Sequence, residues 1–155
     1  MARSPIPAQC FALTVVRRGD RFLLVQERKY EQTWYLPAGR VDPGETFGEA
    51  ARRETLEEAG IPVRLDGVLR VEHSPLPDGI RLRVFFLAHP EDDRPPKRNA
   101  DYESLGAAWV ALDELDRFPL RGAEVRALLR YVAGGGPVFP LGLLTAEGAP
   151  WALPG

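Results

Sequence analysis

The sequence predicts an α/β layered fold. Two stretches with helical periodicity, one early and one late, are separated by several short apolar runs that are typical of strands. One of these runs, Phe22–Val25, is continuously apolar, which predicts a strand buried on both faces. Another alternates, with apolar side chains at 80, 82, 84 and 86 and arginines at 81 and 83. Together these patterns predict a sheet covered by helices.

The first strands are expected at residues 11–16 and 21–28. The first run is apolar and partly β-branched, and residues 17–20 (Arg-Arg-Gly-Asp) provide a turn, so the two runs can form a hairpin. Residues 1–9 contain two prolines and are expected to be a frayed lead-in. Residues 34–39 (WYLPAG) predict an irregular strand end, because Pro37 interrupts the ladder and Gly39 lets the backbone approach a ligand closely.

The early helix has a clear beginning and end. Asp42-Pro43-Gly44 is turn chemistry, and Thr46 with Glu49 three residues later fits a capping box. Gly60, followed by Ile61-Pro62, fits a helix stop.

The later elements follow from the same rules. Residues 90–104 form a long charged loop, and loops of this length in compact domains are often functional. The late helix is indicated by apolar residues at 125, 128, 129 and 132. We also expect a strand at 63–71 broken at Asp66-Gly67, a turn at 75–79, strands at 80–88 and 107–111, and a helical turn at 113–115.

Residues 134–155 contain six glycines and four prolines, which exclude a regular helix. The segment still carries apolar residues at 139, 141, 143, 144 and 151, so we expect it to pack on the body or on a partner subunit of a homodimer. No composition shift marks a boundary, and we interpret residues 1–155 as one domain.

Composition narrows the class of protein. The chain has 155 residues, of which 45% are hydrophobic and 27% charged, and its formal net charge is −2. This charge favours neither a nucleic-acid polymer nor an anionic membrane as partner. Cys10 is the only cysteine, and the sequence shows neither a secretory leader nor an apolar run of the ~20 residues that a membrane span needs. We therefore expect a cytoplasmic protein.

Three glutamates on the early helix suggest a metal site. Glu54, Glu57 and Glu58 are spaced so that they lie on one helix face. Carboxylates this close repel each other, and a hard divalent cation such as Mg²⁺ relieves that repulsion while leaving positions for phosphate oxygens. The alternative is a solvated acidic face paired with Arg52 and Arg53.

The stretch GRVDPGETFGEAARRETLEEAGI, residues 39–61, resembles the Nudix box. The pattern is G, five residues, E, seven residues, R-E, an aliphatic residue, any residue, E-E, any residue, G and an aliphatic residue. The matching positions are Gly39, Glu45, Arg53, Glu54, Glu57, Glu58, Gly60 and Ile61. The one departure is Thr55 at the first aliphatic position, which affects packing and removes no metal ligand.

The resemblance to the Nudix hydrolase family implies a fold and a chemistry. The fold would be an α/β/α sandwich around a mixed sheet, and the reaction would be hydrolysis of a nucleoside diphosphate linked to another group. Mg²⁺, or Mn²⁺ in its place, would be held by Glu54, Glu57, Glu58 and the carbonyl of Gly39. Arg53 would pair with Glu45, and Glu54 is the first candidate for the general base, although relatives also use an acid from a later loop.

Outside the box the candidates are less specific. Glu103 lies where many relatives place one more metal-binding glutamate; Asp101 competes for this role, and a solvated loop acid is the alternative. The candidates for substrate binding are Arg81 and Arg83 for phosphate and Trp34 and Tyr35 for a base, against the alternatives of a solvated strand face and of core packing.

Only the resemblance to known families limits the range of candidate substrates. The stretches TWYLPAGR, ESLGAAWV and PVFPL resemble the Nudix branch that converts oxidised guanine nucleoside diphosphates, such as 8-oxo-dGDP, to monophosphates. Pro77, sixteen positions after Ile61, is a mark of the ADP-ribose pyrophosphatase branch, but a turn explains it equally. A third hypothesis is a nucleotide-binding regulator without activity; such domains usually lose box glutamates, and here all three are present.

Overall fold

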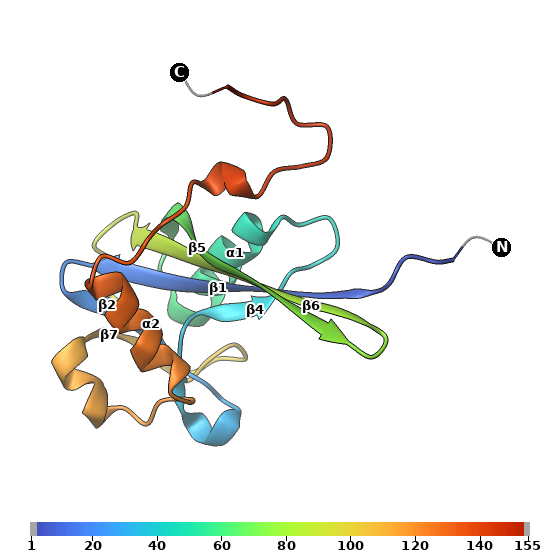
Figure 1. Cartoon of the computed structure of the whole chain (residues 1–155). Coiled ribbons are helices and arrows are strands. Elements are labelled where there is room, and N and C mark those ends of the chain that lie inside the picture. Colours follow the sequence, from blue (N-terminus) through green and yellow to red (C-terminus); the bar gives the residue numbers. More distant parts are fainter. Residues whose placement is uncertain (1–2, 154–155) are drawn as a thin grey trace.

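A computed structural model of the chain describes residues 3–153. Its centre is a seven-stranded sheet in which β3, β2, β1, β6 and β5 are neighbours in that order, while β4 pairs with β1 and β7 with β2 (Figure 1). The β1–β6 pair is parallel and the other pairs are antiparallel, so the sheet is mixed, as expected. The strands are β1 (Ala8–Arg18), β2 (Arg21–Gln26), β3 (Trp34–Tyr35), β4 (Ala38–Arg40), β5 (Val63–Leu76), β6 (Gly79–Pro90) and β7 (Gly106–Ala111).

Two helices cover opposite faces of the sheet. The pleat sends alternate side chains of each strand to opposite sides, so one strand contributes to two cores. On one side, Ala12 and Val16 of β1 belong to clusters that include alanines of α1 (Phe47–Ala59). On the other, Leu13 and Val15 pack in a cluster with Val125 and Leu129 of α2 (Glu124–Ala133). The chain is therefore an α/β/α sandwich.

Most of the expected elements are present, with two corrections. β1 begins at Ala8 rather than at 11, because its parallel pairing with β6 extends that far and Pro7 O accepts a hydrogen bond from Ile80 N at 3.0 Å. The frayed lead-in is therefore shorter than expected. β5 is not broken at Asp66-Gly67; bulges there and between Val68 and Arg70 keep the strand continuous to Leu76.

The early helix begins and ends where its sequence indicates. The Thr46 hydroxyl accepts a hydrogen bond from Glu49 N, and the Glu49 carboxylate accepts one from Thr46 N, which forms the capping box. Gly60 ends the helix in the left-handed region, at φ 72°. Three short 3₁₀ turns, η1 (Tyr30–Gln32), η2 (Leu112–Arg117) and η3 (Leu141–Leu143), complete the elements.

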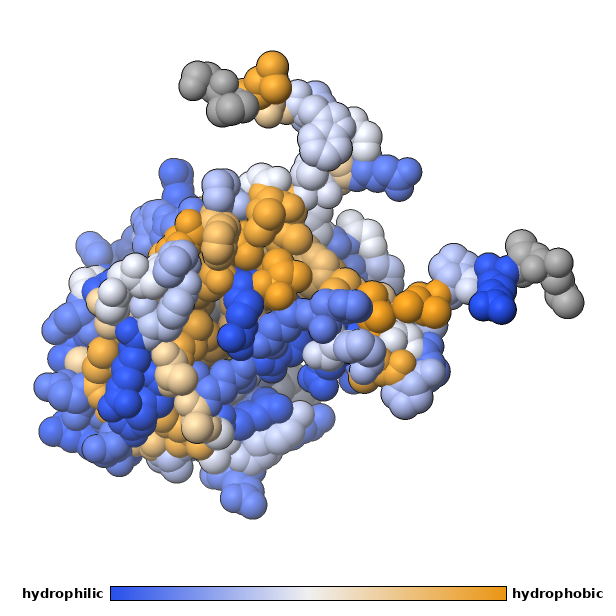
Figure 2. All heavy atoms as spheres, viewed as in Figure 1, coloured by the Kyte–Doolittle hydropathy of each residue, from blue (hydrophilic) through white to orange (hydrophobic). Residues whose placement is uncertain are grey.

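The segment after α2 is irregular apart from η3 and packs on the body only in its first part. Phe139 exchanges two backbone hydrogen bonds with Val68 of β5, both at 2.8 Å, and Leu144 contacts the core cluster beneath α1. Figure 2 shows hydrophobic residues gathered on this side of the molecule. Further on, the chain leaves the body (Figure 1), and Trp151 is fully exposed, so it does not pack on the body; packing on a partner subunit stays a prediction.

Within residues 3–153, neither helix is both long and apolar enough to cross a bilayer.

Candidate active site

Three carboxylates from two distant parts of the chain meet at one end of α1. Glu54 and Glu57 come from the helix and Glu103 from the loop between β6 and β7, and one oxygen of each lies within 4.8 Å of the others. Oxygen-only donors at this separation suit a hard divalent cation. The structure thus brings together two of the three candidate helix glutamates with Glu103, which the sequence alone left in competition with Asp101.

Gly39 lies directly against Glu54. A Cβ added at Gly39 would lie 2.1 Å from the Glu54 carboxyl carbon, which is far inside van der Waals contact. Glycine at this position leaves room for the Glu54 carboxylate against β4, and any side chain here would displace that carboxylate. The spacing between Gly39 and Glu54 in the box therefore has a steric basis.

The Glu58 side chain lies close to Glu54 and to Ala38 of β4. Its Oε1 accepts a hydrogen bond from Ala38 N at 3.3 Å. Burial, followed by the charge of nearby Glu54, raises the pKa of Glu58 to about 9, and burial also raises the pKa of Glu54. These carboxyl groups resist ionisation together, and a bound cation would remove that penalty. The residues present therefore fit a divalent metal ion.

Arg53 connects the cluster to the loop before the helix. Its guanidinium donates to Glu45 at 2.7 and 3.0 Å, to Glu54 at 2.9 Å, to Glu57 at 3.2 Å and to the carbonyl of Arg40 at 3.0 Å. The bonds to Glu45 raise the pKa of Arg53, and the same contact lowers the pKa of Glu45. The ion pair expected from the motif is present, and Arg53 also orients the cluster.

Thr55, the one departure from the box, is fully buried in α1. Its hydroxyl donates to Ala51 O at 2.7 Å, one turn earlier, so the buried polar group has a partner.

A cavity of about 210 Å³ opens beside the carboxylates. Its lining includes Gly39, which lies against Glu54, together with Arg40 and the aromatic residues Phe11 and Tyr35. Arg81 and Arg83 of β6 also line it, as do Glu27, Tyr30 and Arg121. The lining therefore combines aromatic and aliphatic side chains with several arginines, a mixture that is typical of small-molecule sites.

The two expected phosphate contacts differ in their surroundings. Arg83 donates to Glu72 at 2.7 Å and to Glu124, which also accepts the Tyr35 hydroxyl at 2.8 Å. The charge of Arg83 is thus balanced by two carboxylates. One of them, Glu124, also bonds to Tyr35 and so links Tyr35 to Arg83. Arg81 lies 4.7 Å from the centre of the Phe11 ring and, among the described residues, has no carboxylate within ion-pair distance. Arg81 is the better placed of the two for an anion.

Trp34, the other aromatic candidate, is partly buried and packs against the core. Its ring packs edge-on against Phe118 with ring centres 5.0 Å apart, and it contacts the cluster beneath α2. Unlike Tyr35, it does not line this cavity. The core alternative therefore describes Trp34.

Glu27, Tyr30 and Arg121 also belong to the cavity wall, and the sequence did not indicate any of them as site residues. The Arg121 guanidinium lies 3.6 Å from the centre of the Tyr30 ring and 4.8 Å from that of Tyr35, and it donates to Glu27 at 2.9 Å. The second Glu27 oxygen is buried without a partner in the described structure, and burial raises the pKa of this carboxyl. Arg121 is 94 residues from Glu27, so no local pattern indicates the pair.

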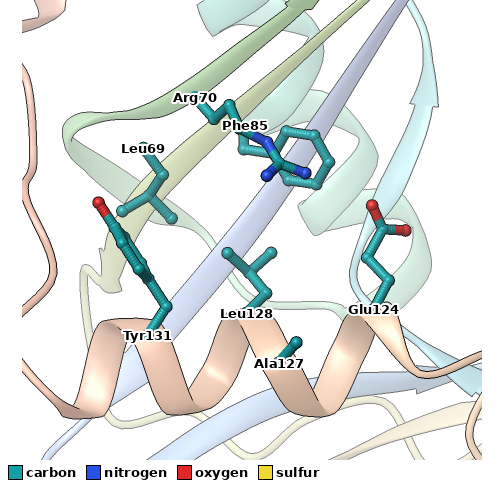
Figure 3. A pocket seen from close by; sticks show the side chains of 7 residues that line it. All are labelled: Leu69, Arg70, Phe85, Glu124, Ala127, Leu128 and Tyr131. Carbon is teal, nitrogen blue, oxygen red and sulfur yellow. The ribbon is translucent and has the colours of Figure 1, made fainter.

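A second cavity, of about 480 Å³, lies between α2 and strands β5 and β6. In Figure 3, Leu128 and Tyr131 rise from α2 toward Leu69 and Phe85, while Glu124 stands at one end. Glu124 is the only acidic residue in the lining. This cavity is larger than the first, but it lacks the group of carboxylates that a cation site needs.

Comparison with known proteins agrees with the fold. A sequence profile described as the NUDIX domain matches residues 8–131. The chain belongs to the Nudix family. A NUDIX hydrolase structure from Nitrosomonas europaea superimposes with a TM-score of 0.75 at 26% identity, covering 92% of this chain and 100% of the other.

Two kinds of relative are informative. Human 8-oxo-dGDP phosphatase NUDT18 is 42% identical over 117 residues, which cover 74% of this chain and 35% of the relative. The NAD-capped RNA hydrolase NudC of Yersinia enterocolitica is 33% identical over 126 residues, which cover 81% of this chain and 46% of the relative. The chain thus spans about a third of the length of the NUDT18 relatives.

Proposed function

We propose that this chain is a Mg²⁺-dependent hydrolase of the phosphoanhydride bond in nucleoside diphosphate derivatives, with Mn²⁺ able to replace Mg²⁺. The observation that carries the proposal is the meeting of Glu54, Glu57 and Glu103 beside a cavity with arginines. A bound divalent cation supplies charge neutralisation and a water of lowered pKa. Glu58 and the carbonyl of Gly39 complete the proposed set of ligands.

The chain's own residues have distinct roles in this proposal. Arg53 orients Glu54 and Glu57, and Arg81 contacts the diphosphate. Tyr35, held by Glu124, forms part of the wall against which the base packs. Glu54 is the proposed general base, because burial raises its pKa and thereby its affinity for a proton. We place this activity in the cytoplasm, since a single cysteine fits a reducing compartment.

The substrate class that we favour is the oxidised guanine nucleoside diphosphates. The 42% identity to a protein named 8-oxo-dGDP phosphatase supports this choice. Pro77 and Asp78 form the tight turn between β5 and β6, so hairpin geometry accounts for the residue that suggested ADP-ribose. ADP-ribose and other nucleotide sugars are the alternative substrates.

The test is a Mg²⁺-dependent assay with 8-oxo-dGDP, 8-oxo-dGTP, ADP-ribose, NADH and diadenosine polyphosphates, reading the phosphate-containing products. We expect a higher kcat/KM for 8-oxo-dGDP than for ADP-ribose. Because both share the diphosphate, the preference must arise in the base pocket, where hydrogen-bonding sites discriminate by up to ~10⁴-fold. A preference for ADP-ribose would instead favour assignment of the chain to the ADP-ribose pyrophosphatase branch. No turnover of any substrate would favour a nucleotide-binding regulator.

A further inference from the structure

Glu103 raises a structural question, because it reaches the cluster from an irregular loop. Residues 91–105 contain no helix or strand, and Glu103 and its neighbour Tyr102 are exposed. An exposed side chain on such a loop keeps its oxygen near Glu54 and Glu57 only if the backbone beneath it is held.

Asp101 holds this backbone. Its Oδ1 accepts hydrogen bonds from the N–H groups of Glu103 at 2.9 Å and Ser104 at 3.2 Å, and its own N–H donates to Ser104 O at 2.9 Å. Its Oδ2 accepts from Lys97 Nζ at 2.6 Å. Both carboxylate oxygens are therefore engaged, and they are engaged with groups of the loop itself.

The same loop is attached to the C-terminal end of α1. The Ser104 hydroxyl donates to Glu58 O at 2.6 Å, and Lys97 Nζ donates to Glu57 O. Lys97 N donates to Ala59 O at 2.8 Å. These carbonyls belong to the last turn of the helix and have no partner within it, and a cation at that end is favoured by the helix dipole.

The attachment is buried although Glu103 is exposed. Ser104 is fully buried, and the Lys97 side chain is only 14% exposed. The hydrogen bonds thus couple the position of the Glu103 backbone to the helix turn that carries Glu57 and Glu58; Lys97 and Ser104 anchor this connection from the buried side, while Asp101 bridges them to Glu103 at the surface.

We propose that Lys97, Asp101 and Ser104 form a latch that holds Glu103 in register with the helix glutamates. Asp101 is then a positioning residue rather than a cation ligand. The proposal rests on the proposed cation site, but it concerns residues that do not themselves bind the ion.

The test measures Mn²⁺ binding without substrate, by electron paramagnetic resonance of the free ion, together with the Mg²⁺ concentration that half-activates turnover. We expect Asp101→Ala to weaken Mn²⁺ binding and to raise that concentration, each about tenfold. Asp101→Asn keeps an acceptor for the two N–H groups and should recover most of the loss. The control is Asp92→Ala, in the same loop, whose carboxylate pairs with Arg94 at the surface and should change neither value.

A double-mutant cycle with Glu103→Gln separates positioning from direct ligation. If Asp101 acts only through Glu103, adding Asp101→Ala to Glu103→Gln should weaken Mn²⁺ binding no further. Additive losses, or wild-type binding by Asp101→Ala, would overturn the latch. If Asp101→Ala does not fold, Ser104→Ala replaces it in the cycle.

The same experiment distinguishes the latch from the proposed function. Equal Mn²⁺ binding by the wild type and Glu57→Gln would overturn the cation site and the latch together. Loss of binding in Glu57→Gln, with full binding in Asp101→Ala, would overturn the latch alone.

Discussion

Glu57 is the residue at which the metal hypothesis is most directly tested. It lies between Glu54 and Glu58 in sequence, and its side chain is 40% exposed, so it can be altered with little effect on packing. Glu57→Gln is nearly isosteric but brings no charge to a cation. We expect kcat to fall about 10²-fold or more with an unchanged melting temperature. A variant with wild-type kcat and Mg²⁺ dependence would show that the metal assignment is wrong.

Gly39 tests the steric basis of the motif. Gly39→Ala places a methyl group where the Glu54 carboxylate lies, and the flexible glutamate must move away. Because Glu54 is displaced rather than the backbone, we expect a loss of activity of about tenfold or more and a small change in stability. The control is Gly142→Ala, whose added methyl group meets no atom within 4 Å. Activity should be assayed and unfolding followed for both variants; equal activities would contradict the role given to Gly39.

At the scale of the element, α1 is held against the preceding loop by Arg53. The two arginines of this helix provide a matched pair, since Arg52 is exposed while the Arg53 side chain is 28% exposed and bonded to Glu45, Glu54 and Glu57. Arg53→Ala leaves these carboxylates unpaired. We expect it to lower the free energy of unfolding by about 2 kcal/mol, between the values for surface and buried pairs, and also to reduce kcat.

Arg52→Ala should be nearly silent in both measurements. Thermal unfolding and steady-state kinetics on the two variants decide the matter. Equal melting temperatures would reject the distinction between the two positions.

The loop before β7 shows how an element without regular structure can be positioned as firmly as a helix. Its hydrogen bonds run to the last turn of α1, and Leu105 N donates to Gln26 O of β2 at 2.9 Å. The loop is therefore attached both to α1 and to β2.

For the whole molecule, the raised pKa values predict how stability depends on pH without metal. The folded-state pKa of Glu58, about 9, lies above its unfolded value of about 4.3, so the folded protein binds the proton more tightly. This contribution to stability is complete below about pH 4 and is lost as the pH rises toward 9. Carboxyl groups whose pKa is lowered in the folded state, such as Glu45, instead stabilise the fold above their unfolded pKa, and this contribution is lost as the pH falls.

Added Mg²⁺ should restore the folding stability that is lost at alkaline pH. Since the ion competes with the proton for the same oxygens, the rise in melting temperature on adding Mg²⁺ should grow between pH 6 and 9. Melting curves with Mg²⁺ and with a chelator, in wild type and Glu58→Gln, test this. An increment independent of pH in the wild type would contradict it.

What the sequence determined by itself is largely local. The bounds of α1, its capping box, the convergence of Glu54 and Glu57 and the two-faced burial of β2 follow from spacings of two to four residues. Such spacings are set by helix and strand geometry, which does not depend on the rest of the chain.

Only the tertiary structure decided the remainder. It placed Glu103 rather than Asp101 at the cluster, packed Trp34 against the core and paired Glu27 with Arg121. It also began β1 at Ala8, because β6, some 70 residues away, pairs with it there. These contacts join residues that are distant in sequence, and their formation depends on how the sheet, helices and loops pack together, which no local periodicity encodes.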